Sequence, residues 1–244
     1  MKVGGLYRYP IKGVGAEPLD AAFLSADAPF PGDRAWAIAH AKAPDRSGWM
    51  PKAAFLQVMA GPGLAAVRAE TAGDRITLSH PDRPTRSFSL PDDAAQLLDW
   101  VRPIWPEDKP APARVLPAPP ESFADNGQAT VHVLTQATLD ALSEAAGQTV
   151  EALRFRANIV ISDAEAWSEL GWVGRRLRLG DAEIEVLEPT GRCRATDANP
   201  DTGTRDIAML ELLSKTTGGK DVGVYARVTR GGTVNRGETV ELLA

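Results

Sequence analysis

"GWVGRRLRLGDAEIEVLEPTGRCRATDANPDTG", residues 171–203, leads from two β-like runs into a loop with the only cysteine of the 244-residue chain. The runs RRLRLG (175–180) and AEIEVLE (182–188) alternate polar and apolar residues, which is the period of a half-buried strand. Prolines and glycines then bound a loop over residues 189–203 that carries Cys193. The stretch therefore predicts two strands that lead to a cysteine-bearing loop.

Cys193 stands between Arg192 and Arg194, a setting unlike that of a structural thiol. A lone cysteine is most often a small buried apolar side chain, which usually lies inside an apolar run. Neighbouring guanidinium groups instead stabilise the thiolate, which is the form that acts as a nucleophile or metal ligand. The flanking cations therefore favour a reactive or metal-binding role for Cys193.

Few other metal ligands accompany this thiol. The chain has no CxxC or HxxxH motif, and His40, His80 and His132 are far apart in sequence, so a zinc site has little support. His132, inside VHVL, is interpreted as a hydrogen-bonded histidine of a strand rather than a ligand. If Cys193 does bind a metal, most of the coordination must come from a cofactor.

Short β-like runs dominate the rest of the chain, and only three segments have a helical pattern. The helix expected over 91–102 has an apolar face of Ala95, Leu98 and Val101, and that over 135–147 has Thr135 as N-cap and Gly147 as its stop. Strands and helices do not alternate regularly, which excludes a doubly wound nucleotide-binding fold. We predict a mainly β protein with a few helices (α+β), a barrel or sandwich. The remaining expected strands are 2–9, 34–40, 74–80, 129–135, 157–162, 222–229 and 238–243, and the third helix is 204–215.

Residues 102–121 contain seven of the nineteen prolines. Proline lacks a backbone donor and fixes φ, so this stretch cannot form a helix or a central strand. We interpret it as an extended connection between an N-terminal unit (1–120) and a C-terminal unit (121–244), with an ordered edge segment as the alternative.

The bulk composition is that of an ordinary globular protein, with 43% apolar and 24% charged residues. A net charge of −5 argues against nucleic-acid binding. A single cysteine cannot form an intramolecular disulfide, and no run approaches the ~18 apolar residues of a membrane span. The N-terminus has no secretory signal, so a soluble cytoplasmic protein that contacts no membrane is expected.

Arginine is frequent around the cysteine, with eight residues between positions 154 and 205. Ten carboxylates share nearly the same window, so most of these arginines are expected to form solvated pairs of little consequence. Arg156 and Arg192 are the expected exceptions, because they adjoin a strand and the cysteine loop. The planar fork of arginine is suited to phosphate.

Six fragments in order resemble the MOSC family, the molybdenum-cofactor sulfurase C-terminal domain, with its N-terminal β-barrel partner. These fragments are LYRYPIKG (6–13), GDRAW (32–36), FRANIVI (155–161), residues 171–203, VGVYARV (222–228) and GTVNRGETVELL (232–243). The resemblance covers nearly the whole chain and implies a MOSC-type β-barrel packed with an N-terminal β-barrel-like unit. It is closer to the amidoxime-reducing enzymes than to the large sulfurases with a pyridoxal-phosphate domain.

The resemblance implies a molybdenum cofactor in which one cysteine thiolate is the only protein ligand to the metal, and soft sulfur ligands suit such a site. Cys193 matches this metal-binding catalytic residue. The matched cofactor-binding positions are Arg192 beside it, Lys12 and Arg34 near the pterin phosphate, Thr135 at a strand-to-helix turn, Arg156, Asn158 and Tyr225. Gly13 and Gly191 stand where relatives often carry serine, and Asn199 replaces a common aspartate.

The resemblance implies an oxidoreductase that reduces N-hydroxylated or N-oxide-like small molecules. One cysteine cannot hold an iron–sulfur cluster, so the electrons are expected from a separate donor protein. Two alternative functions remain open beside the oxidoreductase: a sulfur carrier with a Cys193 persulfide, and a carrier of the molybdenum cofactor without catalysis. A third is a cysteine hydrolase, which requires His132 within hydrogen-bond reach of Cys193.

Overall fold

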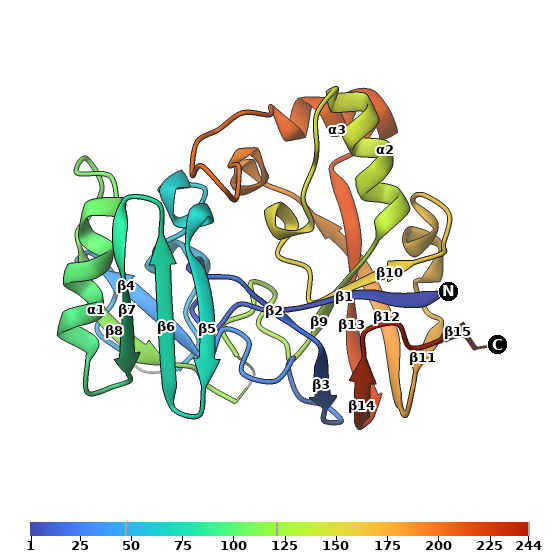
Figure 1. Cartoon of the computed structure of the whole chain (residues 1–244), viewed down its shortest axis with the longest axis horizontal. Coiled ribbons are helices and arrows are strands. Elements are labelled where there is room, and N and C mark those ends of the chain that lie inside the picture. The colour runs from blue at the N-terminus through green and yellow to red at the C-terminus, as the bar shows by residue number, and fades with distance from the viewer. Residues whose placement is uncertain (47, 121, 244) are drawn as a thin grey trace.

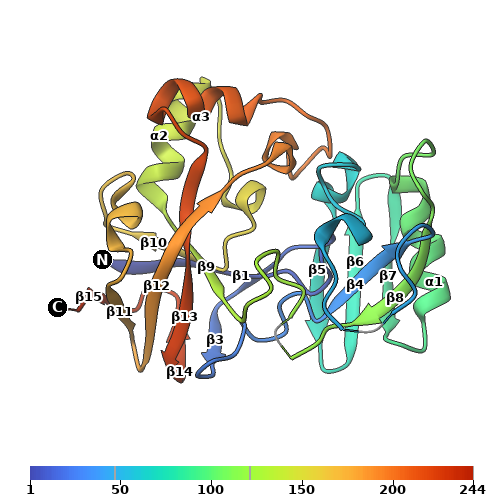
Figure 2. The same ribbon diagram turned by 180° about the vertical axis from the view of Figure 1, so that it is seen from behind.

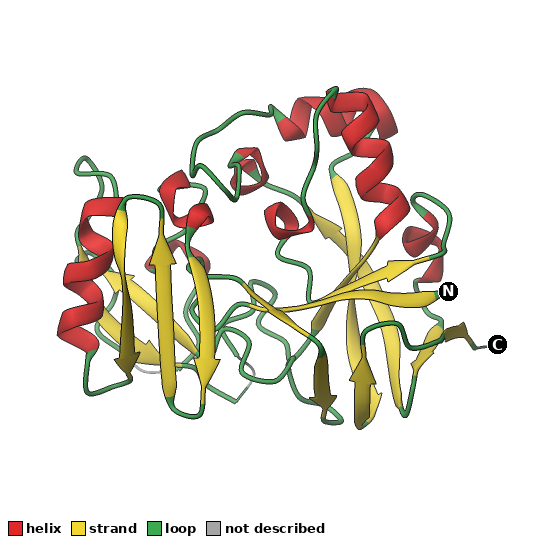
Figure 3. Cartoon of the chain, in the orientation of Figure 1, coloured by secondary structure: helices red, strands yellow, loops and turns green. Residues whose placement is uncertain are grey.

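The structure is a computed structural model that describes residues 1–46, 48–120 and 122–243. Two lobes lie side by side, and strands dominate both (Figures 1 and 3). Glu121, where the predicted C-terminal unit begins, and Ala244, where it ends, lie outside the described residues. The expectation of a mainly β chain with a few helices is confirmed, since the described part of the chain contains fifteen strands and three α-helices.

The larger lobe is built on one eight-stranded sheet. Its order is β15-β11-β12-β13-β9-β10-β1-β2, in which β9 and β10 are parallel and the other neighbours antiparallel. The bounds are β1 (Lys2–Arg8), β2 (Glu17–Leu19), β9 (Val131–Thr135), β10 (Ile159–Ser162), β11 (Arg176–Leu179), β12 (Ala182–Gly191), β13 (Asp221–Arg230) and β15 (Val240–Leu242). The sheet therefore takes strands from both sides of the predicted boundary at residue 120.

Backbone hydrogen bonds join the two ends of this sheet. Val3 donates to the Glu238 carbonyl (2.9 Å) and accepts from Gly237 (2.7 Å), and Val240 donates to the Met1 carbonyl (2.9 Å). These bonds connect β1 to the segment that enters β15, so the strands close around an apolar core. A small sheet of β3 (Ala21–Leu24) and β14 (Gly232–Asn235) adds side chains to the same core.

Helices α2 (Gln136–Ala146) and α3 (Met209–Thr217) cover the outer face of the sheet (Figure 1). Thr135 caps α2 by accepting a hydrogen bond from the Thr138 amide, and Gly147 ends it with φ 66°, as predicted. α3 begins later than the predicted residue 204. Arg205 and Asp206 are instead held in tertiary contacts with Met59 and Arg154, so the segment ahead of Met209 is not helical.

The smaller lobe contains a two-stranded and a three-stranded sheet. β4 (Trp36–His40) pairs with β8 (Pro112–Pro117), while β5 (Arg68–Ala72), β6 (Arg75–His80) and β7 (Arg83–Ser89) form a meander. Helix α1 (Ala94–Val101) packs on β7 and β8. Strands β2, β3, β5, β7 and β14 were not expected from the sequence. β2, β3 and β14 have only three or four residues, too few to show a period, and the longer β5 and β7 contain few apolar residues to mark one.

The described part of the proline-rich stretch, 102–120, contains an ordered edge strand, which was the alternative to the extended connection that we favoured. β8 lies inside it and pairs antiparallel with β4, with Leu116 opposite Ala37. Proline is tolerated there because β8 has a single partner strand, so that a missing amide hydrogen breaks no ladder on its other side.

Helix α1 is shorter than predicted, and its buried face is only partly the predicted one, since Val101 and Leu98 pack on the core. Leu97, Trp100 and Val101 are its buried residues, whereas Ala95 is exposed. The Trp100 indole donates to the Pro84 carbonyl (2.8 Å) and packs edge-on against Phe88, so the large aromatic side chain sets the orientation of the helix.

The segment after β12 bridges the two lobes, as both views show (Figures 1 and 2). Arg68 pairs with Asp201 at 2.6 Å, and Arg205 donates to the Met59 carbonyl at 2.7 Å. Gly203 approaches Gly63 so closely that a Cβ on Gly203 would lie 2.8 Å from the Gly63 Cα.

The short 3₁₀ helices are η1 (Lys52–Ala54), η2 (Pro62–Ala66), η3 (Arg102–Ile104), η4 (Ala152–Phe155), η5 (Ser168–Trp172) and η6 (Arg194–Asp197). None of the described helices has the length and apolar character that crossing a membrane requires.

Candidate functional site

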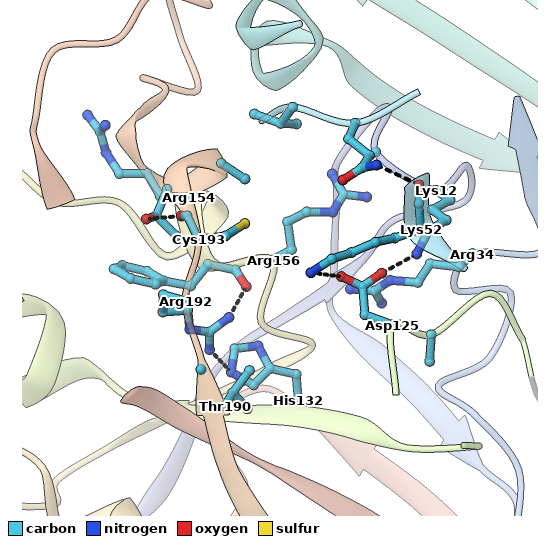
Figure 4. A pocket seen from close by; sticks show the side chains of 18 of the residues that line it. Lys12, Arg34, Lys52, Asp125, His132, Arg154, Arg156, Thr190, Arg192 and Cys193 are labelled. Atoms are coloured by element: carbon cyan, nitrogen blue, oxygen red, sulfur yellow. Dashed lines mark hydrogen bonds and ion pairs between the residues drawn. The ribbon is translucent and has the colours of Figure 1, made fainter. Parts of the chain in front are cut away.

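A cleft of about 950 Å³, including its open mouth, lies where the cysteine loop faces the N-terminal residues (Figure 4). Nine of the ten sequence-predicted site residues line it. They are Lys12, Gly13, Arg34, Arg156, Asn158, Gly191, Arg192, Cys193 and Tyr225. The fold thus brings side chains that are more than 200 residues apart in sequence to one cavity.

Cys193 is half-buried at the entry to η6, and its sulfur lies beside the cavity in Figure 4. Its carbonyl accepts hydrogen bonds from the Thr196 amide (3.1 Å) and hydroxyl (2.9 Å), which fix the backbone of the loop. Ala195 and Ala198 on the same loop pack into the core of the smaller lobe. The thiol is therefore a wall residue of the cleft rather than a core residue.

Arg192 is held by residues of the interior strands β13 and β9 and of η4. Its guanidinium donates to the carbonyls of Val222 (2.9 Å) and Phe155 (3.1 Å) and also to Nε2 of His132. Among the described residues it forms no salt bridge with a carboxylate. Burial lowers its pKa to about 10, so Arg192 keeps its positive charge at neutral pH.

His132 accepts this hydrogen bond, which requires that Nε2 carry no proton. Burial, and then the charge of Arg192, hold the pKa of His132 well below 6.5, so the ring is neutral. Within the described chain no hydrogen bond joins His132 to Cys193. The cysteine–histidine pair that a hydrolase needs is therefore not formed, whereas the interpretation of His132 as a hydrogen-bonded residue of β9 agrees with the structure.

Arg34 and Arg156 lie against the same aromatic ring, that of the fully buried Tyr9. Their guanidinium carbons are 5.6 and 4.2 Å from its centroid, and the Tyr9 hydroxyl donates to the Ala157 carbonyl (3.0 Å). Both arginines have left-handed backbones, with φ of 51° and 52°. A non-glycine residue in this region is strained, and such strain is common at functional sites. The sequence did not single out Tyr9, because its role depends on contacts across some 150 residues.

The charges of these two arginines are balanced differently. Arg34 pairs with Asp33, whereas the side-chain hydrogen bonds of Arg156 in the described chain go to the carbonyls of Ile11 (3.4 Å) and Gly15 (3.5 Å). Burial, followed by repulsion from Arg34, lowers the pKa of Arg156 to about 10, which leaves it charged at neutral pH. Arg156 therefore offers a cation without a carboxylate partner among the described residues.

Lys12 forms a further cationic point on the far side of the cleft from Cys193 (Figure 4). Only 6% of the residue is exposed, and its Nζ donates to the Phe123 carbonyl (2.7 Å) and to Asp125. Burial lowers the pKa of Lys12, and the Asp125 carboxylate opposes that shift. Lys52 and Asp125 line the cleft as well; neither was expected from the sequence, because no motif contains them.

Asn158 and Tyr225 contribute to the walls. Asn158 accepts from the His132 amide (3.0 Å) and donates to the Tyr7 carbonyl (3.2 Å), so it holds β9 and β1 together beneath the cleft. The Tyr225 ring centroid lies 5.8 Å from that of His132, and burial raises the pKa of the phenol.

The two glycines of the site differ in what they tolerate. Gly13 has φ +73°, and a Cβ there would lie 2.6 Å from the Leu56 carbonyl oxygen, so this turn accepts no side chain without moving. A Cβ on Gly191 would be 3.5 Å from Asp221 and meet no clash. Asn199 does not line the cleft: it accepts from the amides of Asp201 (2.8 Å) and Thr202 (3.1 Å) and builds the interlobe turn.

Thr135 is the predicted site residue that the structure does not bring to the cleft. It is fully buried at the start of α2, where its hydroxyl donates to Glu169 (2.9 Å) and lies 2.8 Å from that of Thr138. Burial raises the pKa of the Glu169 carboxyl. The helix-capping expectation for Thr135 thus agrees with the structure, and the hydroxyl faces a buried carboxyl.

The cleft has the chemistry of a site for an anionic ligand that also engages sulfur. Six basic side chains line it against one carboxylate, Asp125, although the chain has a net charge of −5. Arg154 is neutralised by a bidentate pair with Asp206 (2.7 and 2.9 Å), but it is buried, unlike the solvated pairs expected for most arginines of this region. The buried hydroxyl of Thr190 in the wall has no hydrogen-bond partner among the residues that the structure describes. The described residues hold no group of three His, Cys, Asp or Glu side chains that would bind a metal ion.

Family models cover both lobes of the chain. One described as "MOSC domain" matches residues 118–241, and one described as "MOSC N-terminal beta barrel domain" matches residues 1–107. Mitochondrial amidoxime-reducing component 1 of Danio rerio is 26% identical over 190 residues, which cover 71% of this chain and 54% of that protein. The molybdenum cofactor sulfurase of Danio rerio is 38% identical over 73 residues, which cover 30% of this chain and 8% of the sulfurase.

The chain spans about half the length of the first of these relatives and a small part of the second. Among solved structures, the YUAD protein of Bacillus subtilis is similar with a TM-score of 0.48 and 12% identity, over 99% of this chain and 94% of that one. YiiM of Geobacillus stearothermophilus is similar with a TM-score of 0.36 and 19% identity, over 47% of this chain and 54% of that one.

Proposed function

Because the chain belongs to the MOSC family and carries its N-terminal β-barrel domain, we propose that the cleft binds a molybdenum–pterin cofactor through Cys193. In this proposal the protein works in the cytoplasm as a reductase of N-hydroxylated or N-oxide-like small molecules. A separate donor protein supplies the electrons. The similarity to proteins named amidoxime-reducing components supports this class of substrate.

One observation carries the proposal. The half-buried Cys193 thiol shares a cleft with Lys12, Arg34, Arg156 and Arg192, which come from both lobes. A pterin phosphate needs cations, and molybdenum needs soft sulfur ligands. A site for a simple anion would not require the thiol, and a reactive thiol alone would not require four cations.

Each side chain has a defined task. Cys193 binds the metal and, as its protein ligand, tunes its potential. Lys12 and Arg34 face the phosphate end of the ligand, while Arg156 and Arg192 provide donors toward the pterin. Arg192 is already oriented by the Val222 and Phe155 carbonyls, so no rotamer search is needed on binding. When bound, the molybdenum supplies the two-electron chemistry that removes the substrate oxygen as water, with two protons consumed.

The test is the molybdenum content of the protein from cells with an intact cofactor pathway. We expect near-stoichiometric molybdenum in the wild type and its loss in Cys193→Ser. The cofactor-free forms of the two proteins should have the same unfolding midpoint, because Cys193 lies in the cleft wall. Asp201→Asn, at an exposed site outside the cleft, serves as the control and retains the metal. Folded wild-type protein without molybdenum would rule the proposal out.

A sulfur-transfer role is the second candidate, and the similarity to molybdenum cofactor sulfurases favours it. In this role Cys193 holds a persulfide for delivery to a metal centre. Mass spectrometry of metal-free protein distinguishes the two: a Cys193 peptide heavier by one sulfur atom favours the carrier. An unmodified thiol together with molybdenum in the wild type favours the reductase. Cofactor-loaded protein that reduces no N-hydroxylated compound with a chemical electron donor would indicate a cofactor carrier.

A further inference from the structure

Asp125 is the one carboxylate among the residues that line the cleft, and it sits on the cations of the phosphate end (Figure 4). One oxygen accepts from Lys12 Nζ, and the other lies 3.8 Å from Lys52 Nζ. The charge of Arg34 also acts on this carboxylate. Asp125 thus already pairs with cations that a ligand phosphate would bind.

The two partners of this pair differ sharply in burial. The side chain of Lys12 is 8% exposed, whereas that of Asp125 is 46% exposed. The lysine is therefore fixed in the wall, and the carboxylate approaches it from the solvent side. A rotation of the Asp125 side chain toward solvent uncovers the ammonium group without moving the core.

The backbone beside Asp125 is anchored independently of the ion pair. Phe123 is buried with its ring 4.8 Å from that of Phe55, and the Ser122 hydroxyl donates to the Asp33 carbonyl (3.1 Å). The Phe123 carbonyl keeps its hydrogen bond to Lys12 Nζ at 2.7 Å when the carboxylate leaves. An ammonium group has three donors, so Lys12 stays oriented with two donors available to a ligand.

We propose that Asp125 is an internal substitute for a ligand phosphate: it pairs with Lys12 and Lys52 in the free protein and is displaced when a phosphate group enters. The phosphate belongs to the cofactor or is free phosphate, and the chemistry at Lys12 is the same for both. The inference rests on the proposed function for the location of the phosphate end, but it requires no molybdenum. Displacement lowers the apparent affinity for the incoming anion, since part of the free protein is occupied by its own carboxylate.

The test is calorimetric titration of the cofactor-free full-length protein with inorganic phosphate. We expect Asp125→Asn to bind phosphate roughly fivefold more tightly than the wild type, the factor for one half-exposed ion pair that no longer competes. Asp201→Asn removes a carboxylate of an ion pair outside the cleft and should bind like the wild type. Adding Lys12→Met to Asp125→Asn should abolish the gain, with circular dichroism to verify folding of each variant.

Equal or weaker phosphate binding by Asp125→Asn overturns the inference, and so does a gain that survives Lys12→Met. Molybdenum-loaded protein distinguishes the sources: if the cofactor phosphate occupies this place, the loaded Asp125→Asn variant no longer binds added phosphate. Continued binding by the loaded variant, with the gain still dependent on Lys12, assigns the place to free phosphate. If Asp125→Asn does not bind phosphate more tightly but molybdenum binding depends on Cys193, only the role of Asp125 is rejected. If the phosphate titration gives the expected result but the folded wild type holds no molybdenum, only the proposed cofactor is rejected.

Discussion

The guanidinium of Arg192 donates a hydrogen bond to Nε2 of His132, across 60 positions of the sequence. Arginine has no acceptor, so the contact exists only while Nε2 of His132 is unprotonated. A protonated ring would place two cations face to face in a buried wall. The contact therefore couples the protonation of His132 to the integrity of the cleft.

Acid should destabilise the protein through His132. Burial holds its folded pKa well below the unfolded value of 6.5, so the unfolded chain binds a proton first and stability falls as the pH drops below 6.5. We expect the wild type to lose about 1.4 kcal/mol at pH 5.5 relative to His132→Gln, whose amide oxygen can accept from Arg192 without titrating. Urea denaturation at pH 7.5 and 5.5 measures this; equal pH dependence of the two proteins would contradict it.

A side chain at position 223 should damage the same wall. Gly223 has φ +71°, and an added Cβ would lie 2.5 Å from both His132 Nε2 and the Val133 carbonyl oxygen. Gly218 has a similar φ of +73° with nothing within 4 Å, so Gly218→Ala isolates the backbone effect. We expect a loss of about 1 kcal/mol for Gly218→Ala and about 3 kcal/mol for Gly223→Ala by chemical denaturation. Similar losses of stability in the two variants would show that His132 and its neighbouring backbone move at little cost to accept the added Cβ.

Variants of Thr135 test whether this residue caps helix α2 or binds the cofactor. Thr135→Ala removes the acceptor for the Thr138 amide and the donor to Glu169, so the free energy of unfolding should fall by about 1 to 2 kcal/mol. Thr135→Ser keeps the hydroxyl and should lose little. Because Thr135 does not line the cleft, both variants should carry as much molybdenum as the wild type when purified at low temperature. Metal loss in folded Thr135→Ala would assign Thr135 to the cofactor instead.

Glu169 should respond to pH in the opposite sense to His132. Its pKa is raised by burial, so the folded protein retains a proton that the unfolded chain releases, and stability is lost as the pH rises above about 4.5. In the described part of the chain, one Glu169 carboxyl oxygen also lacks a hydrogen-bond partner. We expect Glu169→Gln to be more stable at pH 8 by on the order of 1 kcal/mol, with the difference vanishing near pH 4.5. Thermal unfolding at both pH values measures the effect; a less stable variant at pH 8 would refute it.

Much of the site was predictable because it lies in short contiguous motifs. The arginines beside Cys193 and the turn with Lys12 are visible as local patterns, and the family resemblance assigns them to one site. Tyr9, Lys52 and Asp125 were not predictable, since their positions depend on which distant segments meet. Tyr9, for example, joins Arg34 and Arg156 only after β1 has paired with β10.

Strands and helices were predictable where the pattern of polar and apolar residues is long, and less so for short edge strands and at helix ends. The strands around β12 and β13 have enough residues for a clear period. The buried face of α1 was predicted only in part: Val101 is buried, but Trp100 was missed because it counts as one apolar residue in a pattern, although its size decides which side faces the core. Likewise, α3 starts late because Asp206 is taken up by Arg154, a contact that no local rule anticipates.

The place of β1 in the large sheet bears on how the chain assembles during translation. Lys2 to Leu6 of β1 pair with Ile159 to Ser162, which leave the ribosome some 150 residues later. Until then β1 lacks this partner, and the barrel cannot close before β10 has been made. A fragment limited to the segment that matches the MOSC domain would lack this strand and expose the edge of β10 to other molecules, which invites aggregation.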